Sequence, residues 1–343
     1  MRFYRRHPLA TGITTLIVCV IFVFLISNVS DNAHYEHGRR IVCAATNSDF
    51  SNVLHSADDG TLSSLNIPDW SCRTLLGSEK LQFNCIAFRP GHAIAVCGTG
   101  SGELVLVDSR NGKHLLKKRY HMSPIVALSF GDGGKRFISQ DSSGTVHTCN
   151  SDDLSHVSRT DLGAYSAEQC VAMSPDESKF VSASFSDDIP HLWDAISGDK
   201  LRDFNDIQTS EAYSFTKWSS HGGLIATGTW HHRIVVWDER TLTVLSEIPT
   251  QAPCVSSAVF SPDGTLIMFV DYNSLRLPVI RCWNVSRRLE VSRFALRGFR
   301  AFSIGDIMLC AASHDNRRLI GLSHNGGLML WSHAINVEIS GSE

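Results

Sequence analysis

The residues with the most obvious capacity for chemistry are two adjacent histidines, His231 and His232, in the stretch ATGTWHHRIVVWDERTLTVL (226–245). Imidazole nitrogens bind zinc and act as general bases, so the pair raises the question of a metal or catalytic site. Neighbouring side chains in a turn point apart, however, and two histidines hold a metal only with further ligands from elsewhere. We interpret both as turn or surface residues, with ligand binding as the second interpretation and catalysis or metal binding as the third.

Other catalytic motifs are absent from the sequence. It contains no H-E-x-x-H, G-x-S-x-G, P-loop or C-x-x-C-H pattern. The glycine-rich stretch CGTGSGELV (97–105) is similar to a nucleotide-binding loop, but it lacks the helix that such a loop requires and looks like another hairpin turn. We therefore predict a non-enzymatic protein with no metal and no cofactor.

The cysteines do not form a recognisable ligand set. One of the ten, Cys19, lies in an apolar N-terminal run, and the other nine are scattered without a C-x-x-C pair. Cys85, Cys170 and Cys310 sit in short apolar runs, where cysteine acts as a small buried hydrophobe. One or two disulfides are compatible with this pattern, whereas a disulfide framework or a zinc site is not expected.

The overall composition is that of a folded protein without a general affinity for polyanions. Of 343 residues, 43% are hydrophobic and 19% charged, and the formal net charge is -3. This balance provides no sequence-independent attraction to nucleic acid, so we predict no nucleic-acid partner. We interpret the local basic runs at 113–119 and 287–300 as solvated loops.

The N-terminus has the pattern of a membrane-targeting segment. Three arginines precede the uncharged run LATGITTLIVCVIFVFLIS (9–27), which is about long enough to cross a bilayer as a helix. We favour an uncleaved anchor over a cleaved signal peptide, because the residues after the run offer a poor cleavage site. The positive-inside rule then predicts a cytoplasmic tail (1–8), a transmembrane helix (9–27), a linker (28–40) and an extracytoplasmic domain, which would be secreted if the segment were cleaved.

A repeat occupies the rest of the chain. Units such as SGELVLVDSRNGKHL (101–115) and HHRIVVWDERTLTVL (231–245) each read as a turn, an alternating strand, a Trp-Asp-like end and another turn. Seven copies have equivalent positions 42 to 48 residues apart, at Leu65, Val107, Cys149, Trp193, Trp237, Trp283 and Trp331. Short alternating runs separated by Gly, Pro, Asp and Asn indicate antiparallel strands joined by hairpins. For the unit ending near residue 248 they are YSFTKW, LIATGT, RIVVWD and VLSEI.

These units resemble the WD-repeat family, specifically its seven-bladed β-propellers. Motifs such as FSPDG followed by a small-residue strand and then by LWD or VWD carry the resemblance, which covers 41–340. It implies an all-β ring of four-stranded sheets closed between its first and last blades. The closing outer strand comes either from 34–41 or from 334–340.

The repeats depart from the family's pattern in identifiable places. Leu65, Val107 and Cys149 replace the tryptophan in the first three copies, and Pro190 enters a predicted strand. The family's Gly-His pair survives only as Tyr120-His121, whose partner acid falls at Ser143. We therefore expect the buried histidine-to-aspartate hydrogen bond to be missing there.

The resemblance also implies where partners bind. In this family the residue before the turn acid faces the top of the ring, and His231 and His232 occupy the positions of the family's turn aspartate and glycine. The top-face candidates for partner binding are Asp58, Phe185, Ser186, Trp230, His231 and His324. Trp230 either forms a hot spot there or packs against the adjacent blade.

A lengthened turn in the sixth unit provides a second candidate surface. The stretch VDYNSLRLPVIRCW (270–283) adds a few residues between two strands, and loops on rigid scaffolds commonly bind ligands. Its candidates are Asp271, Tyr272, Asn273 and Arg276, with an unconstrained insertion as the alternative.

Two functions follow from these observations. The first is a non-catalytic scaffold, anchored in the membrane, whose propeller binds a protein or peptide. The alternative is an extracytoplasmic propeller enzyme or small-ligand binder at the channel mouth, which requires acids or histidines to converge from at least three blades.

Overall fold

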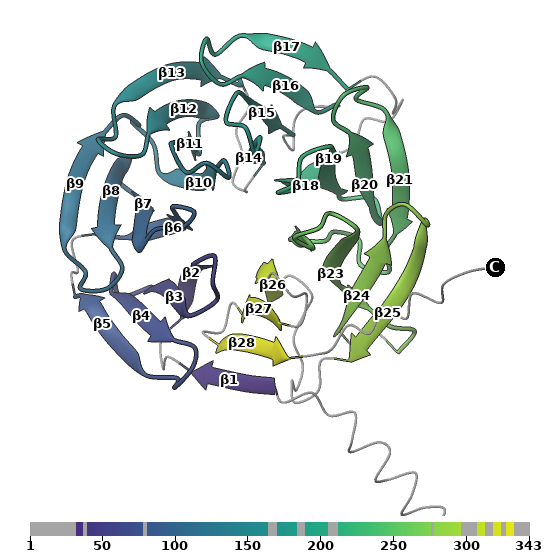
Figure 1. Cartoon of the computed structure of the whole chain (residues 1–343), viewed down its shortest axis with the longest axis horizontal. Coiled ribbons are helices and arrows are strands. Elements are labelled where there is room, and N and C mark those ends of the chain that lie inside the picture. Colours follow the sequence, from purple (N-terminus) through teal and green to yellow (C-terminus); the bar gives the residue numbers. More distant parts are fainter. Residues whose placement is uncertain are drawn as a thin grey trace, which may run out of the picture.

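The computed structural model describes residues 32–36, 40–77, 81–163, 170–183, 189–204, 212–275, 278–295, 307–312, 318–323 and 327–332. In these ranges the regular secondary structure consists of β-strands. The strands form seven four-stranded antiparallel sheets, arranged around a common axis (Figure 1). The prediction of an all-β, WD40-like β-propeller is confirmed.

Six sheets are each built from four strands that follow one another along the chain. We refer to them as blades one to six. The first three are β2 (Ile41–Thr46), β3 (Asn52–Ala57), β4 (Leu62–Asn66) and β5 (Cys72–Leu76); β6 (Phe83–Phe88), β7 (Ile94–Thr99), β8 (Glu103–Asp108) and β9 (His114–Arg119); and β10 (Ile125–Phe130), β11 (Arg136–Asp141), β12 (Thr145–Asn150) and β13 (His156–Asp161). The next three are β14 (Val171–Met173), β15 (Lys179–Ser182), β16 (His191–Asp194) and β17 (Lys200–Asp203); β18 (Tyr213–Trp218), β19 (Leu224–Thr229), β20 (Arg233–Asp238) and β21 (Val244–Pro249); and β22 (Ala258–Phe260), β23 (Leu266–Tyr272), β24 (Pro278–Asn284) and β25 (Leu289–Ala295).

The remaining sheet joins the two ends of the described chain. It contains β26 (Ile307–Ala312), β27 (Arg318–Ser323) and β28 (Gly327–Ser332), and its outer strand is β1 (Asn32–Glu36). Asn32 pairs with Trp331 and Glu36 with Gly327. The outer strand therefore comes from the N-terminal segment, and residues of the predicted linker form part of a sheet.

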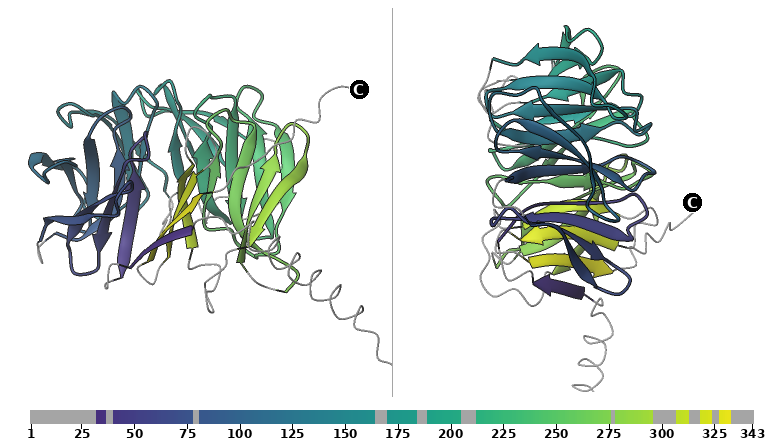
Figure 2. Two further views of the ribbon diagram at one scale, coloured as in Figure 1. Left: turned by 60° about the horizontal axis from the view of Figure 1, so that its bottom comes forward. Right: turned by 90° about the vertical axis from the view of Figure 1, so that its left-hand side faces the viewer.

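Within each sheet the first strand lies nearest the axis and the fourth lies at the rim (Figure 1). Viewed from the side, the sheets stand next to one another around the ring (Figure 2). We call the end where second strands turn into third strands the top face. The opposite end, where third strands turn into fourth strands, is the bottom face.

Apolar side chains on adjacent sheets pack together and form the core. One cluster combines Phe215 and Ile234 of blade five with Ile267 and Phe269 of blade six. Because both faces of a blade are covered by its neighbours, the second strands consist largely of buried residues, as in β19. The repeat thus stabilises a blade only when the next blade packs against it.

The seven positions identified in the repeats occupy one register. Leu65, Val107, Cys149, Trp193, Trp237, Trp283 and Trp331 each pair with the second residue of the neighbouring second strand. In two blades the tryptophan indole donates to a hydroxyl on that strand: Trp237 Nε1 to Thr227 Oγ1 at 3.0 Å, and Trp193 Nε1 to Ser182 Oγ at 2.9 Å. The four strands predicted for blade five are confirmed. Pro190 lies just before β16 rather than in it.

The expectation that blade three lacks a buried histidine-to-aspartate hydrogen bond was wrong. His121 Nδ1 donates to Asp141 Oδ2 at 2.9 Å, and His121 Nε2 lies 2.8 Å from Ser139 Oγ. Asp141 is the last residue of β11, two positions before Ser143, and both side chains are buried. The acid therefore reaches the histidine from the strand end, while Ser143 donates to its other carboxylate oxygen.

His121 belongs to a cluster of aromatic side chains that should make stability depend on pH. Its ring lies 4.7 Å from that of His147, which lies 5.0 Å from that of His156. Burial is the main cause that lowers the pKa of His147 to about 4. The positive charges of His121, His156 and Arg159 lower the pKa further, whereas the negative charge of Asp141 opposes the shift. Burial also lowers the pKa of His121, although its bond to Asp141 opposes the shift.

We expect the protein to lose stability as the pH falls from about 6.5 to about 4. A histidine whose pKa is lower in the folded state stays neutral there, so the unfolded state binds more protons and is favoured by acid. His147→Phe should reduce the loss of unfolding free energy measured in urea between pH 7 and pH 5. His114→Phe, on exposed β9, is the control. An unchanged pH dependence in His147→Phe would contradict this assignment.

The cysteines and the basic runs have structural explanations. Cys85 and Cys170 are buried, as predicted, while the side chain of Cys310 lies outside the described residues. Burial raises the pKa of Cys149 to about 12, which favours an unreactive thiol. The basic runs at 113–119 and 287–300 were wrongly interpreted as loops, because β9 and β25 occupy most of their described residues.

The predicted transmembrane segment, 9–27, lies outside the described residues. In the part of the chain that the structure covers, no helix has the length and hydrophobicity needed to span a membrane.

Candidate interaction face

The top face is built by one hydrogen bond that recurs in five of the described blades. In these blades the residue after the second strand donates its backbone N–H to the carbonyl of the residue just before the first strand. The pairs are Asp58 with Arg40, Gly100 with Gln82, Ser142 with Pro124, Ala183 with Cys170 and Trp230 with Ala212, at 2.9 to 3.0 Å. Asp58 and Trp230, two of the predicted partner-binding residues, therefore occupy equivalent positions on this face, and both are exposed.

The two histidines occupy a tight turn between β19 and β20. His232 has a φ of 59°, and the equivalent Gly60, Gly102 and Gly144 have values of 82°, 83° and 89°. The prediction that His232 takes a glycine position is confirmed. His231 donates its N–H to Thr229 Oγ1 at 3.2 Å, and both imidazoles are exposed.

Trp230 is 41% exposed, so its indole is partly accessible to a partner. The turn that carries it is held from behind by the segment Thr250–Pro253, which connects blade five to blade six. Thr250 donates its N–H to the His232 carbonyl at 2.8 Å, and His232 donates to the Pro253 carbonyl at 3.1 Å. We call residues 250–253 the bridging segment.

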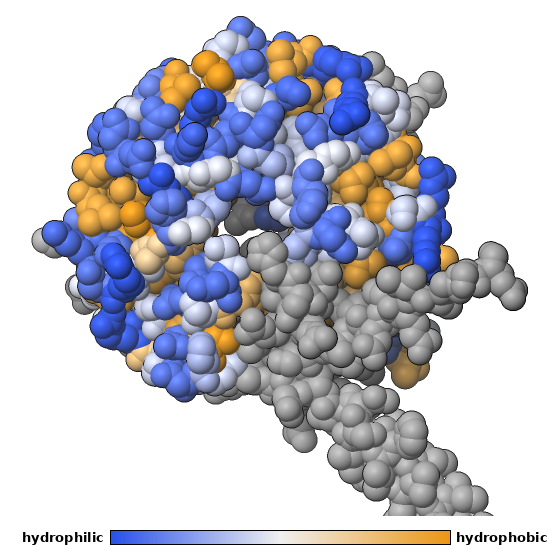
Figure 3. Space-filling view, in the orientation of Figure 1, coloured by the Kyte–Doolittle hydropathy of each residue, from blue (hydrophilic) through white to orange (hydrophobic). Residues whose placement is uncertain are grey.

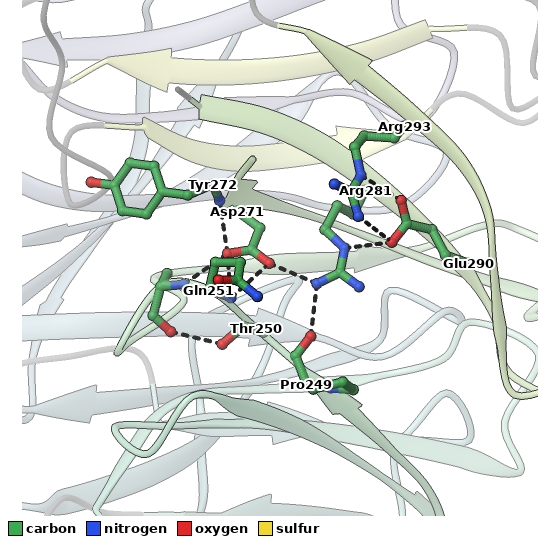
Figure 4. A network of polar contacts seen from close by, with 9 residues as sticks. Pro249, Thr250, Gln251, Asp271, Tyr272, Arg281, Glu290 and Arg293 are labelled. Carbon is green, nitrogen blue, oxygen red and sulfur yellow. Dashed lines mark hydrogen bonds and ion pairs between the residues drawn. The ribbon is translucent and has the colours of Figure 1, made fainter. Parts of the chain in front are cut away.

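The same segment is bonded to blade six through Asp271 (Figure 4). The Asp271 carboxylate accepts hydrogen bonds from the N–H groups of Gln251, at 2.9 and 3.0 Å, and Ala252, at 2.8 Å. Asp271 also forms a 2.7 Å ion pair with Arg281 Nη1, which donates to the Pro249 carbonyl. This network therefore holds blade five and blade six together.

The remaining groups of the network complete the coordination of Arg281. Its Nε donates to Glu290 Oε2 at 2.8 Å, and its guanidinium lies 5.2 Å from the centre of the Phe269 ring. The hydrogen bond from Arg293 is the main cause that lowers the pKa of Glu290. Burial opposes this shift, and the charge of Arg281 reinforces it. Every group with a formal charge in this network thus faces an opposite charge.

The position of Asp271 corrects its proposed role. It was predicted to offer a polar contact from a loop, but it belongs to β23 and is fully buried, so its carboxylate faces the bridging segment. The connection is lengthened as predicted, because β23 ends at Tyr272 and β24 begins only at Pro278; its described residues are 273–275. Tyr272 and Asn273 are half-buried, and the Tyr272 ring points away from the ion pair (Figure 4).

The structure thus brings together two candidate surfaces that lie some 40 residues apart in the sequence. The turn 230–232 is hydrogen-bonded to the bridging segment through His232. The turn 272–275 directly follows Asp271, whose carboxylate accepts hydrogen bonds from the bridging segment and from the Tyr272 N–H. Leu275 is 76% exposed in the second turn. We call these two turns the blade five–six surface.

Another exposed apolar residue of the top face lies elsewhere. Met122, in the connection from β9 to β10, is 87% exposed. On the face seen in Figure 3, hydrophobic residues form separate patches within a mostly hydrophilic surface around a central opening. Separate apolar patches on a polar surface suit contact with a protein or peptide better than insertion into hydrocarbon.

Four other predicted site residues, Phe185, Ser186, His324 and Arg276, lie outside the described residues. Among the residues that are described, no group of three or more His, Cys, Asp or Glu side chains is arranged to hold a metal ion.

Two cavities lie where the first strands turn into the second strands, at the bottom of the ring. One, of about 420 Å³, is lined by residues of four blades, including Ser48, Phe88, Asp132 and Ser220. A smaller one, of about 120 Å³, shares Asp132 and Ser220 with it. Burial raises the pKa of Asp132, an effect that His221 opposes and Glu177 reinforces. The sequence did not single out this carboxylate.

The strand order, the register and the top-face turns define a WD40-like β-propeller. Residues 206–238, which include β19 and β20, match the family model for the WD domain, G-beta repeat. A chain from the solved structure "Crystal Structure of Mitotic Checkpoint Complex" has the same fold, with a TM-score of 0.72 over 88% of this chain and 91% of that chain. Its sequence identity is 17%, so the likeness concerns the fold alone. No curated protein matches the sequence.

Proposed function

We propose that the chain is a membrane-anchored, seven-bladed WD40-like scaffold that binds a protein or peptide through the blade five–six surface. The observation that carries this proposal is the pair of turns held by one bridging segment, with Trp230 and Leu275 exposed on them. A partly exposed tryptophan on a rigid support buries a large area at a small entropic cost, which is typical of a binding hot spot.

The comparisons agree with this proposal without identifying a partner. The matched family model describes a repeat whose propellers are usually non-catalytic interaction modules, and the similar chain belongs to a protein complex. The association by fold is general, so the specific partner has to be found by experiment.

We expect Trp230→Ala to weaken partner binding at least about tenfold, because truncation of a hot-spot tryptophan removes about 2 kcal/mol or more. Cross-linking in native membranes would identify the partner, and titration of that partner would then measure the affinity of each variant. Met122→Ala, which removes another exposed apolar side chain of the top face, is the matched control. Equal affinities for wild type and Trp230→Ala would contradict the assignment of the surface.

The membrane anchor is a separate part of the proposal with its own test. Retention of the full chain in membranes after alkaline carbonate extraction, together with an intact N-terminus by sequencing, would support an anchor at residues 9–27. A mature chain that begins after residue 27 would instead indicate secretion.

A second candidate function rests on the cavities around Asp132. Asp132, Glu177 and His221 come from three consecutive blades at the channel mouth, and the latter two act in opposite directions on the pKa of Asp132. This arrangement suits a small polar ligand better than it suits a protein. Stoichiometric binding of a metabolite that is lost in Asp132→Asn and retained in Trp230→Ala would favour this candidate over the scaffold.

A further inference from the structure

The direction of β1 determines the end of the ring at which the N-terminal segment enters. β28 runs from the top face to the bottom face, and β1 is antiparallel to it, with Asn32 opposite Trp331 and Glu36 opposite Gly327. Asn32 is therefore at the bottom face, and Glu36 is at the top, where the chain continues to β2. Whatever precedes Asn32 in the sequence approaches the ring from below.

Only four residues separate the apolar run from this strand. The run ends at residue 27 and β1 begins at Asn32, so the connection spans at most about 18 Å even when fully extended. A six-residue strand is itself about 20 Å long, which is comparable to the thickness of a blade. If residues 9–27 span a bilayer, the bottom edge of the ring near β1 must lie close to the headgroups.

An unpaired basic corner lies at that edge. The turn between β24 and β25, residues 285–288, belongs to the neighbouring blade and lies at the same end as Asn32. Arg287 and Arg288 are exposed, and no carboxylate in the described part of the chain pairs with either guanidinium. The backbone of the turn is ordered by the Arg287 N–H, which donates to Asn284 Oδ1 at 2.8 Å.

Two other exposed arginines of the ring have acidic partners. Arg110, in the equivalent turn of blade two, forms a 2.8 Å ion pair with Asp108, and Arg293 forms a 2.6 Å ion pair with Glu290. A guanidinium without a carboxylate partner is available for a phosphate, which it can bind through two parallel hydrogen bonds. Arg287 and Arg288 are adjacent in sequence and lie at the same end of the ring as Asn32, so two guanidinium groups of this kind face the side from which the N-terminal segment enters.

We propose that Arg287 and Arg288 bind headgroup phosphates of the bilayer that holds residues 9–27, which directs the blade five–six surface away from the membrane. This inference rests on the proposed anchor. It explains how a tether of four residues leaves the top face open to a partner: the ring is attached by its lower edge, and the turns 230–232 and 272–275 lie at the opposite end of the strands.

Photocross-linking of the full chain in lipid nanodiscs tests the orientation. Benzoylphenylalanine would replace Ser286 beside the basic corner, Asn111 in the equivalent turn across the ring, or His231 on the top face. We expect cross-links to lipid at position 286 and none at 231, whereas position 111 reports whether the bottom face lies flat or tilted. More lipid cross-linking at 231 than at 286 would overturn the proposal.

The role of the arginines is tested in the same nanodiscs. With the cross-linker at 286, Arg287→Gln combined with Arg288→Gln should lower the lipid cross-linking yield at least about fivefold, since each cation near an anionic surface is worth about that factor. Arg110→Gln is the matched control. An unchanged cross-linking yield would contradict phosphate binding by the two arginines, even if the orientation were confirmed. Release of the chain from membranes by carbonate would contradict the anchor at residues 9–27 and therefore this proposal as well.

Discussion

Asp271→Ala is expected to destabilise the propeller by about 3–5 kcal/mol, because it leaves the buried guanidinium of Arg281 without its counter-charge. The side chains of Asp271 and Arg281 are 0% and 8% exposed, and their atoms lie 2.7 Å apart. Three backbone N–H groups, of Gln251, Ala252 and Tyr272, lose their acceptor at the same time. The measurement is the free energy of unfolding from urea titration.

Two further variants make this prediction specific. Asp271→Leu combined with Arg281→Leu should recover part of the loss, because it removes the unpaired charge but not the unsatisfied N–H groups. Asp203→Ala, which breaks more exposed contacts with Lys200 at 3.1 Å and with His191 at 2.6 Å, should cost at most about 2 kcal/mol. A cost for Asp271→Ala no larger than that of Asp203→Ala would contradict the structural role assigned to the network.

The functional consequence of Asp271→Ala should also be measurable. The carboxylate holds the bridging segment, which in turn holds the Trp230 turn. We therefore expect weaker partner binding in this variant under conditions where it remains folded, although Asp271 does not itself reach the surface.

Gly102→Ala is expected to cost about 2–4 kcal/mol of stability, because two independent penalties coincide. Gly102 has a φ of 83°, which a residue with a Cβ rarely adopts. A Cβ built there would lie 2.2 Å from the His121 carbonyl oxygen, and a backbone atom cannot move aside as a side chain can. The measurement is again urea unfolding.

Gly100→Ala is a closely matched control two residues away. Its φ is not in the left-handed region, and its nearest contact for an added Cβ is 3.7 Å, to Asn84 Nδ2. We expect a change within about 0.5 kcal/mol. If both variants behaved alike, the turn would be more adaptable than its geometry implies. Because Gly102 touches His121, its variant should also disturb the bond to Asp141 and the pH dependence of stability.

The repeat accounts for the part of the fold that could be predicted. Strand length, hairpin turns and alternation are local properties, and they recur at Trp193, Trp237 and Trp283 with enough regularity to define the blade. Three blades have another residue in place of this tryptophan, namely Leu65, Val107 and Cys149. These residues pair in the same register as the tryptophans, because backbone pairing depends on strand geometry more than on the side chain.

The same reasoning failed where partners are chosen in space. His121 was assigned to Ser143 by repeat position, whereas a side chain two residues earlier, Asp141, can reach it. Asp271 was interpreted as a loop residue because the turn of the sixth unit is lengthened there, yet it lies in a strand and Arg281, ten residues further on, neutralises it across the strand pair. Sequence position identifies neither the direction of a side chain nor its partner across a sheet.

The amino-acid pattern alone was sufficient for the β-propeller fold and for the turn that contains His231 and His232, whereas the exposure of Trp230 was decided by the structure. It was sufficient because each of these follows from the alternation of side chains along a strand and from the φ that a tight turn requires. Only the folded ring showed that β1 completes the last sheet and that residues 250–253 join the turns of blades five and six. Those features depend on contacts between segments far apart in the chain, which arise only when every blade packs against its neighbours.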